Sequence, residues 1–390
     1  MEQHTLHERI ERWEDLHTEF KAWPINAISC AETLTAFANT DGGQLILGVD
    51  KDRQLVGVPD ADRIMQWVDN FVYQNCEPPL TITQQVVAIA GGQPVVVVSV
   101  PKGDLRPYRT NQGDYFVRTA SGKRRASRQE LLRLFQATET LYYDEMMVAR
   151  ASVDDLDRQR FDRFLQQTYQ QSLRDFSIPY ETLLQNLGLV RADGATLRPN
   201  VAALLFFGIA PQRFLPHAHL MAARLPGTDL AQSPTDVKRI EGTLPEIVAD
   251  TDRFLRIHLP VAHTIESFAP EQRPELPEVA LREVLVNALA HRDYTISAPV
   301  RVFIFDDRVE IRTPGVLPNS VTIAAIRLGA AHVMRNPILY TLFSRLGLVT
   351  GIGSGIYRTI QAVKAATGRE PEIYLQEQEF VVSLPRRSQS

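Results

Sequence analysis

The chain has 390 residues, which is too long for one typical single-core domain and predicts two or three domains. Its net charge of −4 excludes a polycation, so any nucleic-acid site has to be a local patch. Only two cysteines, Cys30 and Cys76, are present, which excludes a disulfide framework and a zinc site of four cysteines. The polar N-terminus and the lack of an apolar run of about 18 residues predict a cytoplasmic protein with no membrane partner.

The first part of the chain, residues 1–140, is predicted to form one α+β unit. Apolar residues at helical spacing predict a helix over residues 26–39. Asp41-Gly42-Gly43 would end it, because glycine tolerates the left-handed conformation found at helix ends. Further elements are predicted in the order strand 44–49, strand 94–100, strand 115–118 and helix 128–135, the last with Ser127 as its cap.

The remainder is predicted to form a connector and a second α/β unit. Residues 141–200 are interpreted as a helical connector with a segment like a small winged helix, and residues 201–390 as the C-terminal module. In the module the expected elements are helix 276–291, hairpin 300–312, helices 338–346 and 356–366, and strand 379–384. This mixture of helices and strands indicates an α/β or α+β fold class.

Three acids near the N-terminus are candidate metal ligands. Glu14 and Glu19 precede Lys21, and Asp50 follows the strand predicted at 44–49. If they met in one cleft, they would bind Mg²⁺ or Mn²⁺ through oxygen, and the metal could activate water against a phosphodiester. Lys21 could hold a phosphate. Spacing alone favours the simpler interpretation, in which these acids lie on solvated faces.

A basic patch follows later in the same unit. Tyr108 and Tyr115 precede six cations within sixteen residues, with Glu130 as the only acid among them: Arg118, Lys123, Arg124, Arg125, Arg128 and Arg133. Cations beside aromatic rings suit a phosphate backbone and a stacked base, which predicts contacts with RNA or DNA. A solvated turn and helix face is the equally weighted alternative.

These motifs together resemble the Schlafen domain and its bacterial AlbA-like relatives. The resemblance rests on E-x4-EFK ending at Lys21, on AFANTDGGQLILGVD ending at Asp50, and on YFVRTASGKRRAS ending at Ser127. It implies that Glu14, Glu19 and Asp50 form the metal-dependent catalytic site of an endoribonuclease that cuts transfer RNA. As the alternative it implies a DNA-binding regulator, because many bacterial relatives are known only as DNA-binding domains or regulators. Because the nuclease relatives carry two such lobes, it also implies a homodimer or higher homo-oligomer.

A second constellation lies in the helix predicted at 276–291. Glu283, Asn287 and His291 recur at i, i+4 and i+8, so they follow one helix face. A carboxylate and an amide on one face could polarise water and hold Mg²⁺. Spacing alone favours a polar face on an otherwise apolar helix.

The order of these residues resembles the N-box helix of GHKL-type ATPases, and the C-terminal stretch is similar to the RecG-like modules of bacterial proteins. GIGSGIYR, with Gly351, Gly353 and Gly355, is similar to the second glycine box of these ATPases. The resemblance implies a GHKL-like α/β sandwich that binds ATP, with Glu283 as base, Asn287 as magnesium ligand, and His291 and Gly315 at the nucleotide. Arg335 would be a phosphate contact. Thr313 stands where these ATPases carry an aspartate that binds adenine.

Two functions therefore compete. The chain is predicted to be a metal-dependent, Schlafen-like endoribonuclease with a nucleotide-responsive C-terminal module, or else a DNA-binding transcriptional regulator that senses nucleotide and cuts nothing. A module for protein assembly is a third and weaker alternative. The acids discriminate between the first two: convergence within reach of one metal ion favours the nuclease, whereas pairing with basic residues favours the regulator.

Overall fold

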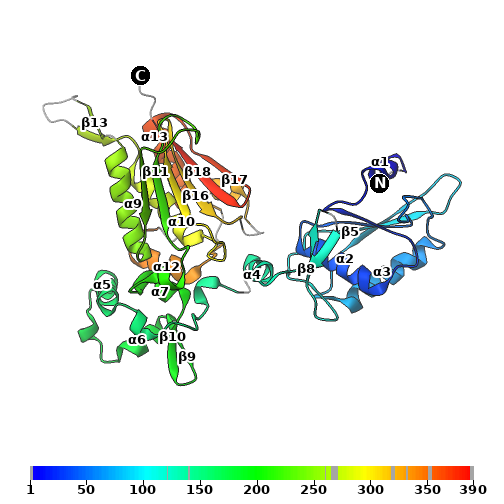
Figure 1. The fold of residues 1–390 in the computed structure, drawn as a ribbon, viewed down its shortest axis with the longest axis horizontal. Coiled ribbons are helices and arrows are strands. Elements are labelled where there is room, and N and C mark those ends of the chain that lie inside the picture. The colour runs from blue at the N-terminus through cyan, green and yellow to red at the C-terminus, as the bar shows by residue number, and fades with distance from the viewer. Residues whose placement is uncertain are drawn as a thin grey trace. The chain divides into compact units, whose positions relative to one another are not determined.

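The computed structural model describes residues 3–120, 122–138, 141–259, 261–264, 271–317, 321–330, 333–349 and 354–386. Contacts divide the chain into two compact units, Met1–Leu141 and Tyr142–Ser390, which are described separately (Figure 1). Both units combine helices with sheets, which confirms the predicted α+β class. No helix in the described part of the chain is both long and apolar enough to cross a membrane.

Unit 1 is built on a four-stranded sheet of order β1-β2-β5-β4, in which only β1 and β2 are parallel. Its elements are α1 (Gln3–Arg12), β1 (Thr18–Lys21), α2 (Ala27–Asn39), β2 (Gly43–Leu47), α3 (Ala61–Asn75), β3 (Cys76–Glu77), β4 (Thr83–Val87), β5 (Val95–Val100), β6 (Arg109–Thr110), β7 (Phe116–Thr119), β8 (Gly122–Arg125) and α4 (Arg128–Ala137).

The sheet of unit 1 has a core on each face, because successive side chains of a strand point to opposite sides. Leu45 and Leu47 of β2 pack with α2 and α3, whereas Ile46 between them packs with α1. Asn26 caps α2 by accepting a hydrogen bond from the backbone nitrogen of Ser29 at 3.0 Å, as expected for a helix that starts at residue 26 or 27. The same alternation decides which side chains of β1 face α2.

Unit 2 holds a six-stranded sheet of order β12-β11-β15-β16-β18-β17. Its elements are α5 (Arg158–Tyr169), α6 (Tyr180–Asn186), β9 (Val190–Asp193), β10 (Thr196–Pro199), α7 (Val201–Phe207), α8 (Pro211–Phe214), β11 (Leu220–Arg224), β12 (Asp236–Ile240), α9 (Leu244–His258), β13 (Val261–Thr264), β14 (Glu271–Pro274), α10 (Glu278–His291), β15 (Val300–Ile304), β16 (Arg308–Pro314), α11 (Ile323–Arg327), α12 (Pro337–Arg345), α13 (Gly355–Thr367), β17 (Glu372–Gln376) and β18 (Glu379–Pro385), with 3-10 turns at Tyr143–Glu145, Val153–Asp155 and Leu173–Asp175.

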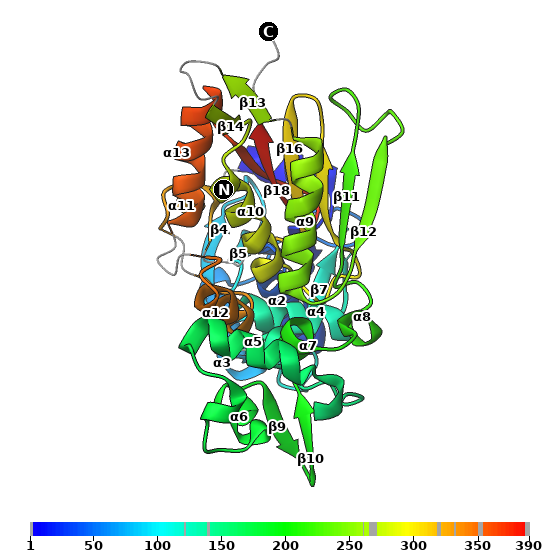
Figure 2. The ribbon, with the colours of Figure 1, turned by 90° about the vertical axis from the view of Figure 1, so that its left-hand side faces the viewer.

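Helices α9, α10 and α13 lie on one face of this sheet (Figure 2). The apolar sequence of α7 is buried at all seven positions, which explains why no polar face is visible in its sequence. Side chains of α5, α6 and α7 belong to the same apolar core as those of α10 and β16. A hairpin of β9 and β10 follows α6, and the winged-helix interpretation of this segment stays a prediction.

Two buried carboxylates fix the ends of unit 2. Glu275, just before α10, forms a bidentate ion pair with Arg386 at 3.0 Å for each bond, and both side chains are at most 9% exposed. Asp144 is fully buried, and its Oδ2 accepts a hydrogen bond from the backbone nitrogen of Leu339 in the first turn of α12 at 3.0 Å. Burial raises the pKa of Asp144 to about 7, although the backbone hydrogen bonds oppose the shift.

Candidate functional site

The acids predicted near the N-terminus lie in a cluster of charged side chains in unit 1. Glu19 and Lys21 alternate along β1 and therefore share one face. Lys21 Nζ lies 2.8 Å from Glu19 Oε1 and 3.7 Å from Glu14 Oε1. Arg118, on β7, is fully buried and donates a second ion-pair hydrogen bond to Glu19. Burial raises the pKa of Glu19, but the hydrogen bonds from Lys21 and Arg118 outweigh it and hold the pKa below its ordinary value.

The third predicted acid makes different contacts. Asp50 Oδ1 accepts hydrogen bonds from the backbone nitrogens of Asp52 at 2.9 Å and Gln54 at 2.8 Å, so it stabilises its own turn. Glu14 and Glu19 thus meet at Lys21, whereas Asp50 does not share these contacts. Among the described residues, no three histidine, cysteine or acidic side chains are grouped as a metal ion would require. The structure therefore brings Glu14 and Glu19 together without Asp50, and the three-acid metal site implied by the Schlafen resemblance stays a prediction.

Lys123 points towards α2, beside the charged cluster formed by Glu14, Glu19, Lys21 and Arg118, and is not part of an open basic surface. Its Nζ donates to Ser29 O and Ser29 Oγ at 2.9 Å and to Thr33 Oγ1 at 2.8 Å, and it lies 3.4 Å from Glu32 Oε2. Burial lowers the pKa of Lys123, while Glu19 and Glu32 act in the opposite direction. Sequence reasoning missed Glu32. The positions 29, 32 and 33 share one face of α2, and that spacing was the available signal.

The rest of the predicted basic patch is largely paired within unit 1. Arg124 forms a bidentate pair with Glu130 at 2.7 and 2.8 Å, and Arg125 lies 2.7 Å from Asp114. Arg128 is exposed at the start of α4. Tyr108 is buried, and its backbone nitrogen donates to the side chain of Asn39 at 2.7 Å, which makes it a packing residue.

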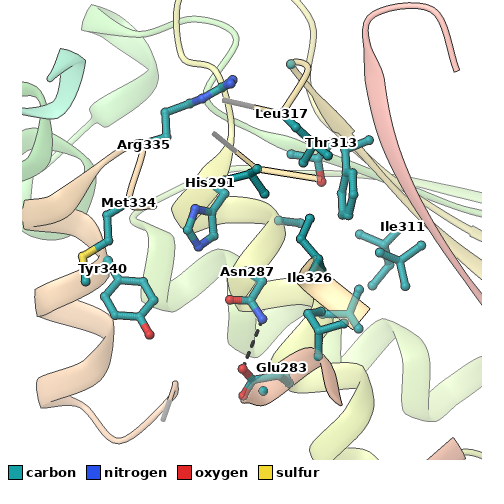
Figure 3. A pocket seen from close by; sticks show the side chains of 18 of the residues that line it. Glu283, Asn287, His291, Ile311, Thr313, Leu317, Ile326, Met334, Arg335 and Tyr340 are labelled. Carbon is teal, nitrogen blue, oxygen red and sulfur yellow. Dashed lines mark hydrogen bonds between the residues drawn. The ribbon is translucent and has the colours of Figure 1, made fainter. Parts of the chain in front are cut away.

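A pocket in unit 2 brings the second constellation together. Glu283, Asn287 and His291 of α10 all face it, and Asn287 Nδ2 donates to Glu283 Oε1 at 3.1 Å (Figure 3). Strands β16 and β18 form its floor. The pocket is lined by Glu283, Val284, Asn287, Ala288, His291, Ile311, Thr313, Gly315, Val316, Leu317, Val321, Ile326, Met334, Arg335, Tyr340, Gly355, Ile356, Phe380 and Val382.

The first residue of α13 packs directly on the carboxylate of Glu283. A Cβ added at Gly355 would overlap that carboxylate, so a larger residue at this position would require the side chain of Glu283 to move. Burial raises the pKa of Glu283, and the hydrogen bond from Asn287 opposes the shift. The unpaired N–H groups at the start of a helix favour an anion, which makes this end of the pocket suited to phosphate. Gly351 and Gly353 of the predicted glycine box lie outside the described residues.

The other predicted residues line the opposite end of the pocket. Burial, reinforced by Arg335, lowers the pKa of His291 to about 4, so its ring is neutral near pH 7. Arg335 Nη1 lies 3.5 Å from Asp293 Oδ2, and its other terminal nitrogen donates to Val316 O. Gly315 has φ = +120° and leaves no room for a Cβ beside Arg335.

Several pocket residues were missed by sequence reasoning, namely Ile326, Met334, Tyr340, Ile356 and Phe380. They come from α11, the segment before α12, α12 itself, α13 and β18. Their apolar character is indistinguishable in the sequence from that of core residues. Only the arrangement of these elements around α10 shows that they face a cavity.

The donor atoms in this pocket fit a magnesium ion. Glu283 supplies carboxylate oxygen and Asn287 an amide oxygen, which are the hard ligands that Mg²⁺ prefers. Because Asn287 donates to Glu283 through Nδ2, its Oδ1 is the amide atom left for a cation. The charged cluster of unit 1 and this pocket are the two candidate sites.

Comparisons with known proteins match the domain that holds the charged cluster and the C-terminal part of unit 2, whereas α10, with Glu283, Asn287 and His291, lies before that C-terminal match. Residues 14–127 match the family model described as "Schlafen, AlbA_2", and residues 297–384 match "Putative ATP-dependent DNA helicase recG C-terminal". Residues 132–221 match a domain of unknown function, DUF8451. The chain therefore contains a Schlafen AlbA_2 domain and a RecG-like C-terminal module, which confirms both of these resemblances.

One solved structure adds a likeness in fold, and a second is reported for its sequence identity. The DIP2311 protein from Corynebacterium diphtheriae is 21% identical, and the alignment covers 98% of this chain and 80% of that one with a TM-score of 0.50. The N-terminal domain of a RecG-related protein from Nitrosomonas europaea is 27% identical over 32% of this chain and 92% of that one, with a TM-score of 0.26. None of the curated proteins compared with the sequence matches it.

Proposed function

We propose that this protein binds nucleic acid through unit 1 and a magnesium-bound nucleoside triphosphate through the pocket of unit 2, and that it acts as a nucleotide-responsive regulator. The observation that carries the proposal is the hydrogen bond between the half-buried Asn287 and the buried Glu283, whose carboxylate lies against Gly355 at the N-terminus of α13. The names of the two matching families, Schlafen AlbA_2 and DNA helicase RecG, support a role in nucleic-acid biology.

Each side chain has a role in the proposed nucleotide site. Asn287 would hold Mg²⁺ through Oδ1, and the metal would neutralise phosphate charge. Glu283 would accept a proton from water at the phosphate end, a role that suits a carboxylate whose pKa is raised by burial. The neutral ring of His291 and the apolar floor would bind the nucleoside without a charge penalty.

Binding rather than cutting is favoured by the contacts of the acids in unit 1. Glu19 is paired with two cations, and Asp50 is hydrogen-bonded to the backbone of its own turn. Pairing with basic residues is the arrangement expected of the regulator. Exposed Arg128 and the partly exposed Lys21 would contribute to contacts with a phosphate backbone.

Calorimetric titration of the full chain with ATP and Mg²⁺ tests the nucleotide site. Asn287→Ala should weaken binding at least tenfold, because it removes a ligand of the metal and leaves Glu283 without its donor. Asn186→Ala makes the same chemical change at an exposed position of α6 and should bind like the wild type. The proposal fails if the wild type binds no ATP at millimolar concentration, or if Asn287→Ala binds it unchanged.

A metal-dependent endoribonuclease acting on transfer RNA is the second candidate. It is favoured by one observation, the proximity of the two glutamates to each other, since Glu14 and Glu19 lie 3.7 and 2.8 Å from Lys21 Nζ. The test is cleavage of total transfer RNA with Mn²⁺ by the wild type and by Glu19→Gln, which keeps the shape of the side chain. Cleavage that is lost in the variant would support the nuclease. Light scattering on the same samples would show whether a homodimer forms, as a two-lobed site requires.

A further inference from the structure

The two ends of the unit 2 pocket offer different chemistry. Pro314 O accepts a hydrogen bond from Asp293 N at 2.9 Å, so Thr313 lies near the C-terminal end of α10. Glu283 lies eight residues before His291, which is roughly 12 Å along the helix axis. Thr313 and Glu283 therefore mark opposite ends of the pocket (Figure 3). Since the Glu283 end suits Mg²⁺ and phosphate, a bound nucleotide would place its base at the Thr313 end.

The floor at the Thr313 end is almost entirely apolar. It consists of Ile311 and Thr313 from β16 and of Phe380 and Val382 from β18. Thr313 is 6% exposed and is the one polar side chain among these described floor residues. The neighbouring backbone offers few donors, because Pro314 has no N–H and Gly315 N donates to Gln378 O at 2.8 Å. Within this floor, the hydroxyl of Thr313 is therefore the side-chain group that can hydrogen-bond to a base.

From this arrangement we propose that the base end of the pocket accepts purines whether position 6 carries an amino or an oxo group. A hydroxyl rotates freely and can donate or accept, whereas a carboxylate at the same position could only accept. Thr313 can thus accept from the amino group of adenine or donate to the oxo group of hypoxanthine. The site would bind adenine and hypoxanthine nucleotides with similar affinity. This inference rests on the proposed nucleotide site and adds its specificity.

ATP and ITP are the matched pair of ligands, because in them the 6-amino group of adenine is replaced by the 6-oxo group of hypoxanthine. Titration of the full chain with each nucleotide and Mg²⁺ should give dissociation constants within about threefold of each other, since the two neutral hydrogen bonds are of similar strength. Thr313→Val should weaken both by a similar factor of about two to ten. Thr313→Ser keeps the hydroxyl and should retain the affinity of the wild type for both.

The possible outcomes separate the specificity from the site. The inference is supported if ATP and ITP bind the wild type with similar affinity and Thr313→Val weakens the binding of both by the same factor. A preference of more than tenfold for either nucleotide would overturn it while leaving the nucleotide site intact. A loss for only one nucleotide in Thr313→Val would also overturn it. If neither nucleotide binds the wild type, the proposed function itself fails and the inference fails with it.

Discussion

Replacing Asp144 by asparagine should change how the stability of unit 2 depends on pH. The carboxylate of Asp144 is fully buried and accepts a hydrogen bond from Leu339 N. Its pKa is raised from 3.8 to about 7 by burial, so the folded protein holds a proton there that the unfolded chain releases. The contribution of Asp144 to the free energy of unfolding is therefore fully present below pH 3.8 and is lost as the pH rises towards 7.

The size of the effect follows from the shift in pKa. Each pH unit between the unfolded and folded values changes the free energy of unfolding by about 1.4 kcal/mol. For a shift from 3.8 to about 7, the wild type should lose roughly 2.5 kcal/mol between pH 5 and pH 8 through this group alone. Asp144→Asn keeps an oxygen that can accept from Leu339 N but cannot ionise. The variant should therefore become more stable relative to the wild type as pH rises.

Scanning calorimetry of the full-length wild type and variant at several pH values provides the assay. A difference of roughly 2.5 kcal/mol corresponds to about 5–10 °C in the melting temperature of a unit of this size. All three tryptophans, Trp13, Trp23 and Trp67, lie in unit 1, so their fluorescence identifies the unit 1 transition. A stability difference between variant and wild type that stays constant from pH 5 to pH 8 would refute the reasoning.

Three further predictions concern the candidate sites. Arg118→Met should destabilise unit 1 by roughly 3–5 kcal/mol, because it leaves the buried Glu19 carboxylate with Lys21 as its remaining ion-pair partner. Urea unfolding followed by tryptophan fluorescence measures this loss, and an unchanged unfolding midpoint would contradict it. Gly355→Ala should weaken ATP binding or lower the thermal stability of unit 2, because the Cβ of the alanine would overlap the carboxylate of Glu283. A variant that matches the wild type in both titration and calorimetry would count against this packing. The wild type should lose stability in unit 2 as pH falls from 6.5 towards 4, because the pKa of His291 in the folded protein is lowered to about 4, and His291→Gln should not show this loss. Calorimetry that finds the same acid sensitivity in both proteins would disprove this prediction.

Periodicity in the sequence was sufficient to predict α10 and its polar face. Glu283, Asn287 and His291 recur every four residues among apolar neighbours, so their common direction follows from helix geometry. The match of residues 14–127 likewise confirms what the motif from Glu14 to Asp50 indicates about the domain. In both cases the evidence is local, because it depends on residues that are close in the chain.

Contacts between distant segments could not be predicted in this way. Lys123 reaches α2 across 90 to 94 residues of sequence, so its charge was interpreted as part of an open basic patch. Asp144 is one of many acids until α12 packs over it, because burial depends on residues nearly 200 positions away. Asp50 illustrates the opposite case, in which a local turn engages a carboxylate that the motif alone would assign to a metal.

The ion pair between Glu275 and Arg386 has a consequence for how the unit 2 pocket can adapt to a ligand. It joins the segment before α10 to the residue that follows β18, and these two elements supply one wall and the floor of the pocket. Breaking a buried pair costs several kcal/mol, so the wall and floor should move as one rigid frame. Any closure around a ligand would then be concentrated in α11, α12 and α13. Hydrogen exchange with and without nucleotide should show its largest changes in those helices and its smallest in β18.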